Sequence, residues 1–537
     1  MSTTRAAGSP VTPEVGRPAQ ARVRRVLLLL AVFLCAACGL VYELALVTLG
    51  SYLLGSSITQ TSIVIAVTMF AMGVGAILVK PLLGRPLRAF IAVEIGLGLV
   101  GGLSVPVLYA AFSWLHVYTP AMVAVSFAIG ALIGAEIPLL MALLQRLRAQ
   151  EAARAIADIN AVDYVGALVG GLLFPFWLLP RFGLLEGTLV IAAVNVAAAG
   201  MVAFAFTTGR RRERWTSMAV CLGVIAGLVL MGTRAAQFEA SAQQALFRDP
   251  IVHSERSPYQ SIVLTRGAVT GADRDDLRLF LDGDLQFSSI DEYRYHEMLV
   301  HPALNGSHGR VLILGGGDGL ALREVVRTPG VEEVTLVDLD PAVVDLARSY
   351  EPLRELNEDA WADERVTYLA ADAFTWIRDH GGEQAGRWDS IIVDFPDPDS
   401  TSLAKLYSVE LYRMLRSLLS ADGRMVVQSG SPFFAPEAFW CVEATLAEAG
   451  YATTAYHADV PSFGDWGFVL AIAATAPNGP PPALGLGPDT PATRFISDEV
   501  LAAAAVFPAD RARRDVEPST LLDPAILRYA DRGWVGY

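Results

Sequence analysis

The chain has 537 residues, of which 53% are hydrophobic and 18% charged, and its mean hydropathy is +0.42. Soluble domains usually carry about 25% charged residues, so the composition excludes a protein that is soluble throughout. The net charge of -14 and the pI near 5.1 exclude a general nucleic-acid-binding protein, which needs a basic surface to displace counterions. Cationic small molecules are the expected ligands.

The apolar excess lies in the first part of the chain. Seven apolar stretches are long enough, at about 20 residues, to cross a bilayer as helices; they span residues 26–50, 58–79, 90–112, 121–144, 162–179, 184–206 and 218–231. After an N-terminal tail over residues 1–25, we therefore expect a multi-pass α-helical domain over residues 26–234 that contacts lipid in the cell membrane. Cleavage of a signal peptide is not expected, because the first stretch stays apolar through Leu49.

Positive charges fall on alternate connections between these stretches. They gather at Arg22, Arg24 and Arg25, at Lys80, Arg85 and Arg88, at Arg146, Arg148 and Arg154, and at Arg210, Arg211, Arg212 and Arg214. The positive-inside rule then places the N-terminus in the cytoplasm. Seven spans would place everything after Arg234 outside the cytoplasm, and one span more or fewer would reverse that.

Ionisable side chains lie in or near the apolar stretches, where they are costly and point to function by default. Glu43, Glu94, Glu136 and Asp163 either line a path for a cation or pair with arginines and backbone groups at helix ends. G-x-x-x-G spacings predict close packing within one bundle; they occur at Gly98 and Gly102, Gly130 and Gly134, and Gly166 and Gly170.

Four cysteines occur in the chain, Cys35, Cys38, Cys221 and Cys441. They are too few and too scattered to predict a disulfide framework or a zinc site. Cys35 and Cys38 form a C-x-x-C pair, but this pair lies inside an apolar stretch. The sequence therefore predicts no metal.

From about Ile251 the pattern changes to alternating apolar strands and helices. A small β region at 260–265 and 277–281 precedes strands at 311–314, 334–337, 366–369, 390–393 and 424–428, with helices at 341–350 and 408–419. This alternation predicts an α/β domain with a mostly parallel sheet covered by helices on both faces. Ligands of such domains gather at the carboxyl ends of the strands.

A glycine-rich turn, G-G-G-D-G at residues 315–319, follows the first of these strands. Such a turn lets backbone approach a ligand, and an acidic residue about 20 positions later can bind ribose hydroxyls; Asp338 occupies that place. The pattern alone fits S-adenosylmethionine-like ligands, dinucleotides or a fold without ligand. Asp318 inside the turn would repel a pyrophosphate, which favours a cationic or neutral ligand.

Aspartates end consecutive strands or loops of this sheet. They are Asp318, Asp338, Asp372 and Asp394, with Asp397 and Asp399 just beyond. Because these ends meet at one edge of a parallel sheet, we expect a strongly negative cleft that attracts a polycation.

Five strings in this part resemble the spermidine synthases, the polyamine aminopropyltransferase family, including its membrane-anchored subgroup. They are SPYQ at 257–260, LDGDLQFSSIDEYRYHEMLVHP at 281–302, VLILGGGDGLALREV at 311–325, VTLVDLDPAVVDLA at 334–347 and DFPDP at 394–398 followed by LYS at 406–408. The resemblance covers residues 251–475 and implies a Rossmann-like, methyltransferase-type domain with a small N-terminal β region. Residues 476–537 remain as a linker and a C-terminal extension.

The resemblance implies transfer of an aminopropyl group from decarboxylated S-adenosylmethionine, a co-substrate, to putrescine, with no prosthetic group. The donor would be held by Gln260, Asp338, Asp372 and Ala373, the polyamine by His296, Asp318 and Asp397, and Asp394 would be the catalytic acid/base. The amine is protonated at neutral pH, so a base must remove its proton. An aspartate titrates near pH 3.9, and crowding by other carboxylates should raise that value.

Three positions depart from the family's pattern. Ala373 stands where a glycine is usual, Ser400 and Thr401 replace a Gly-Pro, and Phe463 stands where a tyrosine would reach the acceptor amine. Two other functions remain open: a methyltransferase using intact S-adenosylmethionine, and a polyamine carrier or sensor without turnover. A homo-oligomer is also compatible with the sequence.

Overall fold

The structure, a computed structural model, describes residues 18–54, 57–145, 152–207, 211–268, 275–473 and 480–533. The chain divides into two compact units, Met1–Arg248 and Asp249–Tyr537. Some residues of the sequence argument lie outside the described ones, namely most of the N-terminal tail, Arg146, Arg148, Arg210 and the end of the C-terminal extension at 534–537.

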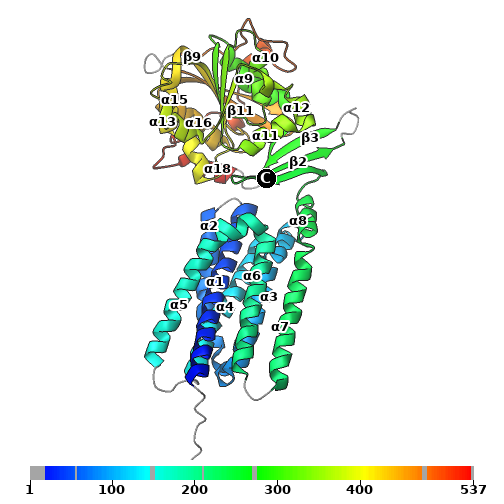
Figure 1. Ribbon diagram of the computed structural model, residues 1–537. Helices are drawn as coiled ribbons and strands as arrows, with labels where there is room; N and C mark the ends of the chain where they lie inside the picture. The colour runs from blue at the N-terminus through cyan, green and yellow to red at the C-terminus, as the bar shows by residue number, and fades with distance from the viewer. Residues whose placement is uncertain are drawn as a thin grey trace, which may run out of the picture. The chain divides into compact units, whose positions relative to one another are not determined.

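The first unit is a bundle of long helices (Figure 1). Its elements are α1 (Pro18–Leu54), α2 (Ser57–Leu78), the short η1 (Lys80–Gly84), α3 (Pro86–Ser113), α4 (Tyr118–Gln145), α5 (Ala152–Leu173), η2 (Phe174–Leu178), α6 (Leu179–Phe206), α7 (Arg211–Gly232) and α8 (Ala235–Gln244). Six helical segments in the described residues are long and apolar enough to cross a membrane.

The seven predicted stretches correspond to six continuous apolar helical segments of the described residues. Two of the stretches lie in one 50-residue segment, Ala157–Phe206, because α5, the π-helical turn η2 and α6 follow one another without a gap. The backbone of this segment is broken at Gly183, where φ is 67° and ψ is -170°. The two predicted stretches lie on either side of this break.

Glycines bring the helices of this unit into backbone contact. A Cβ added at Gly134 in α4 would lie 2.0 Å from the carbonyl oxygen of Met72 in α2. A Cβ added at Gly166 in α5 would lie 2.4 Å from the carbonyl oxygen of Phe33 in α1. Only hydrogen fits at these positions, which confirms the prediction that the G-x-x-x-G spacings serve packing within one bundle.

The second unit begins with a small antiparallel sheet and continues with a large mixed one. The small sheet contains, in order, β1 (Ile251–Arg256), β2 (Ser261–Gly267), β3 (Asp276–Leu281) and β4 (Asp284–Ser288). The large sheet has the order β10-β11-β9-β8-β5-β6-β7. Its strands are β5 (Arg310–Gly315), β6 (Glu333–Asp338), β7 (Val366–Ala370), β8 (Trp388–Asp394), β9 (Leu419–Gln428), β10 (Tyr451–Val460) and β11 (Gly464–Ala473).

Neighbouring strands from β5 to β9 pair in parallel, and β11 and β10 extend the sheet antiparallel at one edge. Alternate residues of β5 enter two separate cores: Val311 and Ile313 pack into one, Leu312 and Leu314 into the other. Such burial on both faces explains the continuous apolar strands in the sequence. The predicted Rossmann-like domain with a small β region before it is confirmed.

Helices cover both faces of the large sheet (Figure 1). They are α9 (Glu292–Leu304), α10 (Leu320–Arg327), α11 (Pro341–Ser349), α12 (Glu351–Leu356), α13 (Ala373–His380), α14 (Thr401–Ala404), α15 (Val409–Leu418), α16 (Pro436–Glu448), α17 (Asp498–Ala504) and α18 (Ala525–Gly533).

The C-terminal extension is part of this unit's core. Ile496 and Leu501 enter one core and Ile526 enters the other. The buried carboxylate of Glu297 in α9 accepts backbone N–H groups of residues 494, 495 and 496 at 2.7, 2.9 and 3.1 Å. The described part of the extension therefore packs against the rest of the second unit.

Candidate functional site

The glycine-rich turn between β5 and α10 brings backbone close to two of the predicted aspartates. Gly315 has a φ of 83°, and a Cβ added there would lie 2.1 Å from the carbonyl oxygen of Asp394. A Cβ added at Gly317 would lie 2.9 Å from Oδ2 of Asp338, an oxygen that accepts the Gly317 N–H at 3.0 Å. Glycine is required because this turn touches the ends of β6 and β8.

Asp318 is part of this turn, and Asp338 at the end of β6 contacts it. The second carboxylate oxygen of Asp338 accepts the N–H of Asp340 at 2.9 Å, and Asp318 accepts the N–H of Leu320 at 2.9 Å. Burial raises the pKa of each carboxyl to about 6. For Asp318, His296 opposes this rise and Asp394 adds to it, so these three side chains interact.

Asp394 ends β8, and its Oδ1 accepts a hydrogen bond from the Tyr295 hydroxyl at 2.5 Å. Burial raises the pKa of this carboxyl, while His296 and Tyr295 oppose the rise and Asp338 adds to it. Asp397, in the following turn, accepts the side-chain amide of Gln428 at 3.3 Å. Burial raises the pKa of Asp397 to about 6.

The predicted aspartates differ in their cationic partners. Asp372 forms an ion pair with Lys405, whose Nζ lies 2.8 Å from its Oδ2. Among the described residues, no arginine or lysine forms an ion pair with the other four, Asp318, Asp338, Asp394 and Asp397. Burial alone would raise the pKa of Asp372, but Lys405 and the helix-capping contact with Thr375 lower it. Asp372 therefore adds less negative charge to the expected cleft than the strand-end aspartates without such a partner.

The other donor-site candidates lie near these strand ends. Gln260 donates its amide to Oδ2 of Asp340 at 3.0 Å, and the Ser257 hydroxyl donates to the same oxygen at 2.6 Å. Ala373 is buried at the start of α13, directly after Asp372. Asp340 was not singled out from the sequence, although it follows Asp338 by two residues within a family-like string.

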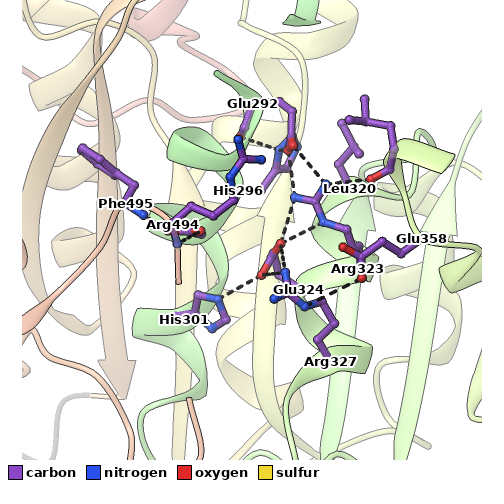
Figure 2. Close-up of polar contacts among 12 residues, drawn as sticks. Glu292, His296, His301, Leu320, Arg323, Glu324, Arg327, Glu358, Arg494 and Phe495 are labelled. Atoms are coloured by element: carbon purple, nitrogen blue, oxygen red, sulfur yellow. Dashed lines mark hydrogen bonds and ion pairs between the residues drawn. The ribbon is translucent and has the colours of Figure 1, made fainter. Parts of the chain in front are cut away.

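His296 is buried in α9, and a polar network fixes its ring (Figure 2). Its Nδ1 lies 2.8 Å from the backbone oxygen and 3.0 Å from Oε2 of Glu292. Both contacts are acceptors, so Nδ1 carries the proton and Nε2 points elsewhere. Burial lowers the pKa of His296, but the Glu292 carboxylate outweighs burial and the net direction is upward.

Arg323 in α10 holds Glu292 in place (Figure 2). Its two terminal nitrogens donate to the two Glu292 carboxylate oxygens at 3.0 and 2.9 Å, and its Nε donates to Glu324 at 2.9 Å. Glu324 in turn contacts His301 at 3.2 Å. Sequence reasoning missed Glu292 and Arg323, although a glutamate four residues before a histidine places both on one helix face.

Phe463 lies in the turn between β10 and β11, close to Tyr295, which donates a hydrogen bond to Asp394. Its ring centroid is 6.0 Å from that of Tyr295 and 5.1 Å from that of Trp466. The residue that departs from the family pattern therefore packs beside the tyrosine that binds Asp394. Tyr295 itself was not singled out, although it directly precedes His296.

A Rossmann-like fold in which four strand-end or loop carboxylates, Asp318, Asp338, Asp394 and Asp397, have no cationic side-chain partner among the described residues defines a domain suited to cationic ligands. Residues 292–480 match the family model described as spermine/spermidine synthase domain. Polyamine aminopropyltransferase 1 of Streptomyces coelicolor is 57% identical over 537 residues, covering 99% of both chains. The polyamine aminopropyltransferase of Mycobacterium tuberculosis is 47% identical over 536 residues, covering 97% of this chain and 99% of its own.

The chain belongs to the polyamine aminopropyltransferase family and is an enzyme. The resemblance expected from the sequence is thereby confirmed. Among solved structures, a spermidine synthase in complex with the transition-state analogue AdoDATO matches with a TM-score of 0.42 and 25% identity, over 48% of this chain and 85% of that one.

Proposed function

We propose that this enzyme transfers the aminopropyl group of decarboxylated S-adenosylmethionine to putrescine, giving spermidine and methylthioadenosine. The observation that carries the proposal is a set of four carboxylates that lack a cationic side-chain partner among the described residues: Asp318, which is buried, and Asp338, Asp394 and Asp397, which are half-buried. A sulfonium donor and a diammonium acceptor would supply the missing positive charge.

In this proposal the donor and the acceptor are bound by different residues at the strand ends. Asp338 and Gln260 bind the nucleoside part of the donor, with Asp372 and Ala373 at the neighbouring strand end. Asp318, Asp397 and the Nε2 face of His296 bind the acceptor diamine. The Glu292–Arg323 pair orients His296 and does not touch substrate.

Asp394 acts as the base. It takes a proton from the acceptor ammonium, and the neutral nitrogen then attacks the methylene next to the sulfonium. The new nitrogen–carbon bond forms as the carbon–sulfur bond breaks, and sulfur keeps the electron pair as the thioether of methylthioadenosine. Burial supports this role, because it raises the pKa of Asp394 and so makes the carboxylate a stronger base.

A methyltransferase is the main alternative on this fold. Intact S-adenosylmethionine carries a carboxylate, which the unpaired aspartates would repel. The test is to incubate the purified full chain with each donor and a panel of diamines, and to measure methylthioadenosine against S-adenosylhomocysteine. Release of S-adenosylhomocysteine, or donor and amine binding without either product, would overturn the proposal.

The pH profile provides a separate prediction. The kcat/KM for putrescine should fall as pH drops through 6, because protonation of Asp318 and Asp397, with pKa values of about 6, removes the charge that binds the ammonium groups. Amines with pKa values near 10 stay protonated throughout, so the substrate does not cause this fall. Asp318→Asn should be less active and have a shallower acid limb; a wild-type profile that is flat from pH 5 to 7 would contradict the assignment.

We also propose that the first unit is inserted in the cell membrane. Large apolar side chains on its helices are exposed within the chain, among them Phe70 at 68% and Phe176 at 79%, as expected for groups that face lipid. The chain should remain in the membrane pellet after an alkaline carbonate wash and require detergent for release. Release by the wash would contradict insertion.

The side that carries the second unit can be tested with an impermeant maleimide on intact cells. Ser349, an exposed residue of α11, is suitable for replacement by cysteine, because the four natural cysteines are buried. If both predicted stretches within Ala157–Phe206 cross the membrane, the chain has seven crossings. With a cytoplasmic N-terminus, as the positive-inside rule predicts, Ser349→Cys should then be labelled from outside the cell. Labelling only after cell lysis would mean an even number of crossings.

A further inference from the structure

A cluster of ionisable side chains lies inside the helical unit, whereas the residues proposed for the transfer reaction belong to the second unit. Cys35 of α1, Glu94 of α3 and Glu136 of α4 each place one ligand atom within 4.8 Å of the others. Their exposed fractions are 1%, 0% and 5%. Side chains from three helices, far apart in sequence, thus meet at one buried point.

These carboxylates lack the partners that buried charges need. By geometry neither oxygen of Glu94 accepts a hydrogen bond from a described residue, and Oε1 of Glu136 has none either. The ion pairs found between described residues of this unit, Arg25–Asp158 and Arg88–Glu213, do not involve them. Unpaired buried carboxylates are strongly destabilising unless they are protonated or bind a cation.

Asn195 of α6 provides an independent observation at the same point. It is fully buried, and its side-chain nitrogen donates to the backbone oxygen of Glu94 at 3.0 Å. Its own side-chain oxygen accepts no hydrogen bond from a described residue. The amide therefore lies beside Glu94 with an unused side-chain oxygen, which is a further potential ligand or a partner for a metal-bound water.

We propose that Cys35, Glu94 and Glu136 bind a divalent transition-metal ion of the zinc class. Thiolate and carboxylate oxygen together suit zinc, which takes sulfur and oxygen ligands, whereas magnesium and calcium prefer oxygen alone. Binding displaces the thiol proton and neutralises most of the buried negative charge. The ion would join α1, α3 and α4, so it would stabilise the bundle and take no part in the transfer reaction.

From the sequence no zinc site was expected, because the four cysteines are too few and too scattered. Cys35 and the two carboxylates are 59 and 101 residues apart, and they come together only when the bundle folds. Cys38, one turn further along α1, is also buried, but its thiol lies 3.7 Å from the backbone oxygen of Ile191 and its sulfur is not part of the cluster. Cys38 is therefore a matched control.

The test uses the full chain, purified in detergent with an affinity tag that contains no histidine. After equilibration with zinc and removal of excess metal, wild type and Cys38→Ser should retain stoichiometric zinc, while Cys35→Ser and Glu136→Gln should lose at least about 10-fold in affinity. With cobalt in place of zinc, a near-ultraviolet thiolate-to-metal absorption band should appear in wild type and Cys38→Ser and be absent in Cys35→Ser.

Aminopropyl transfer and monodisperse elution should persist in every variant, which shows that the chain is folded independently of the metal result. Three results would overturn the proposal: no zinc or cobalt bound by wild type, equal binding by Cys35→Ser, or zinc-independent binding of an alkylammonium that Glu94→Gln abolishes.

Discussion

Asp394→Asn should lower kcat for aminopropyl transfer by about 10²–10⁴-fold while binding of the donor persists. The amide has nearly the same shape and still accepts a hydrogen bond from the Tyr295 hydroxyl, which lies 2.5 Å from Asp394 Oδ1 in the native protein. It cannot accept the ammonium proton. Initial rates of methylthioadenosine release, together with donor affinity by calorimetry, measure the two effects separately.

The matched control is Asp345→Asn, an aspartate exposed on α11. This variant removes the same charge outside the site and should keep native rates. Near-native turnover by Asp394→Asn would remove this residue from the role of base. Loss of donor affinity equal to the loss of kcat would instead indicate that Asp394 serves binding.

Arg323→Met should destabilise the second unit by about 3–5 kcal/mol, because removing one partner of a buried ion pair leaves the other uncompensated. Arg323 donates to both oxygens of Glu292 and to Glu324, and all three side chains are buried (Figure 2). The thermal midpoint for inactivation of the purified full chain should fall by several degrees. Arg354→Met, which removes an exposed arginine paired with Asp359, should leave the midpoint nearly unchanged.

A double variant separates the role of this network in stability from its role in orienting His296. Arg323→Met combined with Glu292→Gln removes a buried charge together with its partner, so part of the lost stability should return. Activity should stay low, because the His296 ring loses the carboxylate that accepts its Nδ1 proton. Recovery of both stability and putrescine KM would show that the network serves folding alone.

The parallel strands and the carboxyl-end aspartates were predictable because each depends on local pattern. The apolar strands β5 to β9 are continuous runs ended by polar residues, and their alternation with helices implies parallel pairing. Asp318, Asp338 and Asp394 could be assigned to one edge of the sheet for the same reason. The closing strands β10 and β11 were not predicted, because their place in the sheet depends on pairing with β9.

Contacts between distant segments were not predictable. The Lys405–Asp372 pair, the Tyr295–Asp394 hydrogen bond and the Arg323–Glu292 pair join residues 33, 99 and 31 positions apart. A sequence shows the side chains but not which of several acidic groups a given cation will reach. Hydropathy separates residues 162–206 into two stretches, whereas helical hydrogen bonding continues between them through η2. The number of membrane crossings stays a prediction.

The contact between Glu297 and the chain after residue 493 shows that a recognisable domain and a folding unit need not end at the same residue. The matched family domain stops at residue 480, whereas the N–H groups that satisfy this carboxylate come later. A version of the protein shortened at that limit would retain every proposed substrate-binding aspartate. It would nevertheless leave a charged oxygen pair without donors next to His296, and we expect it to aggregate during expression.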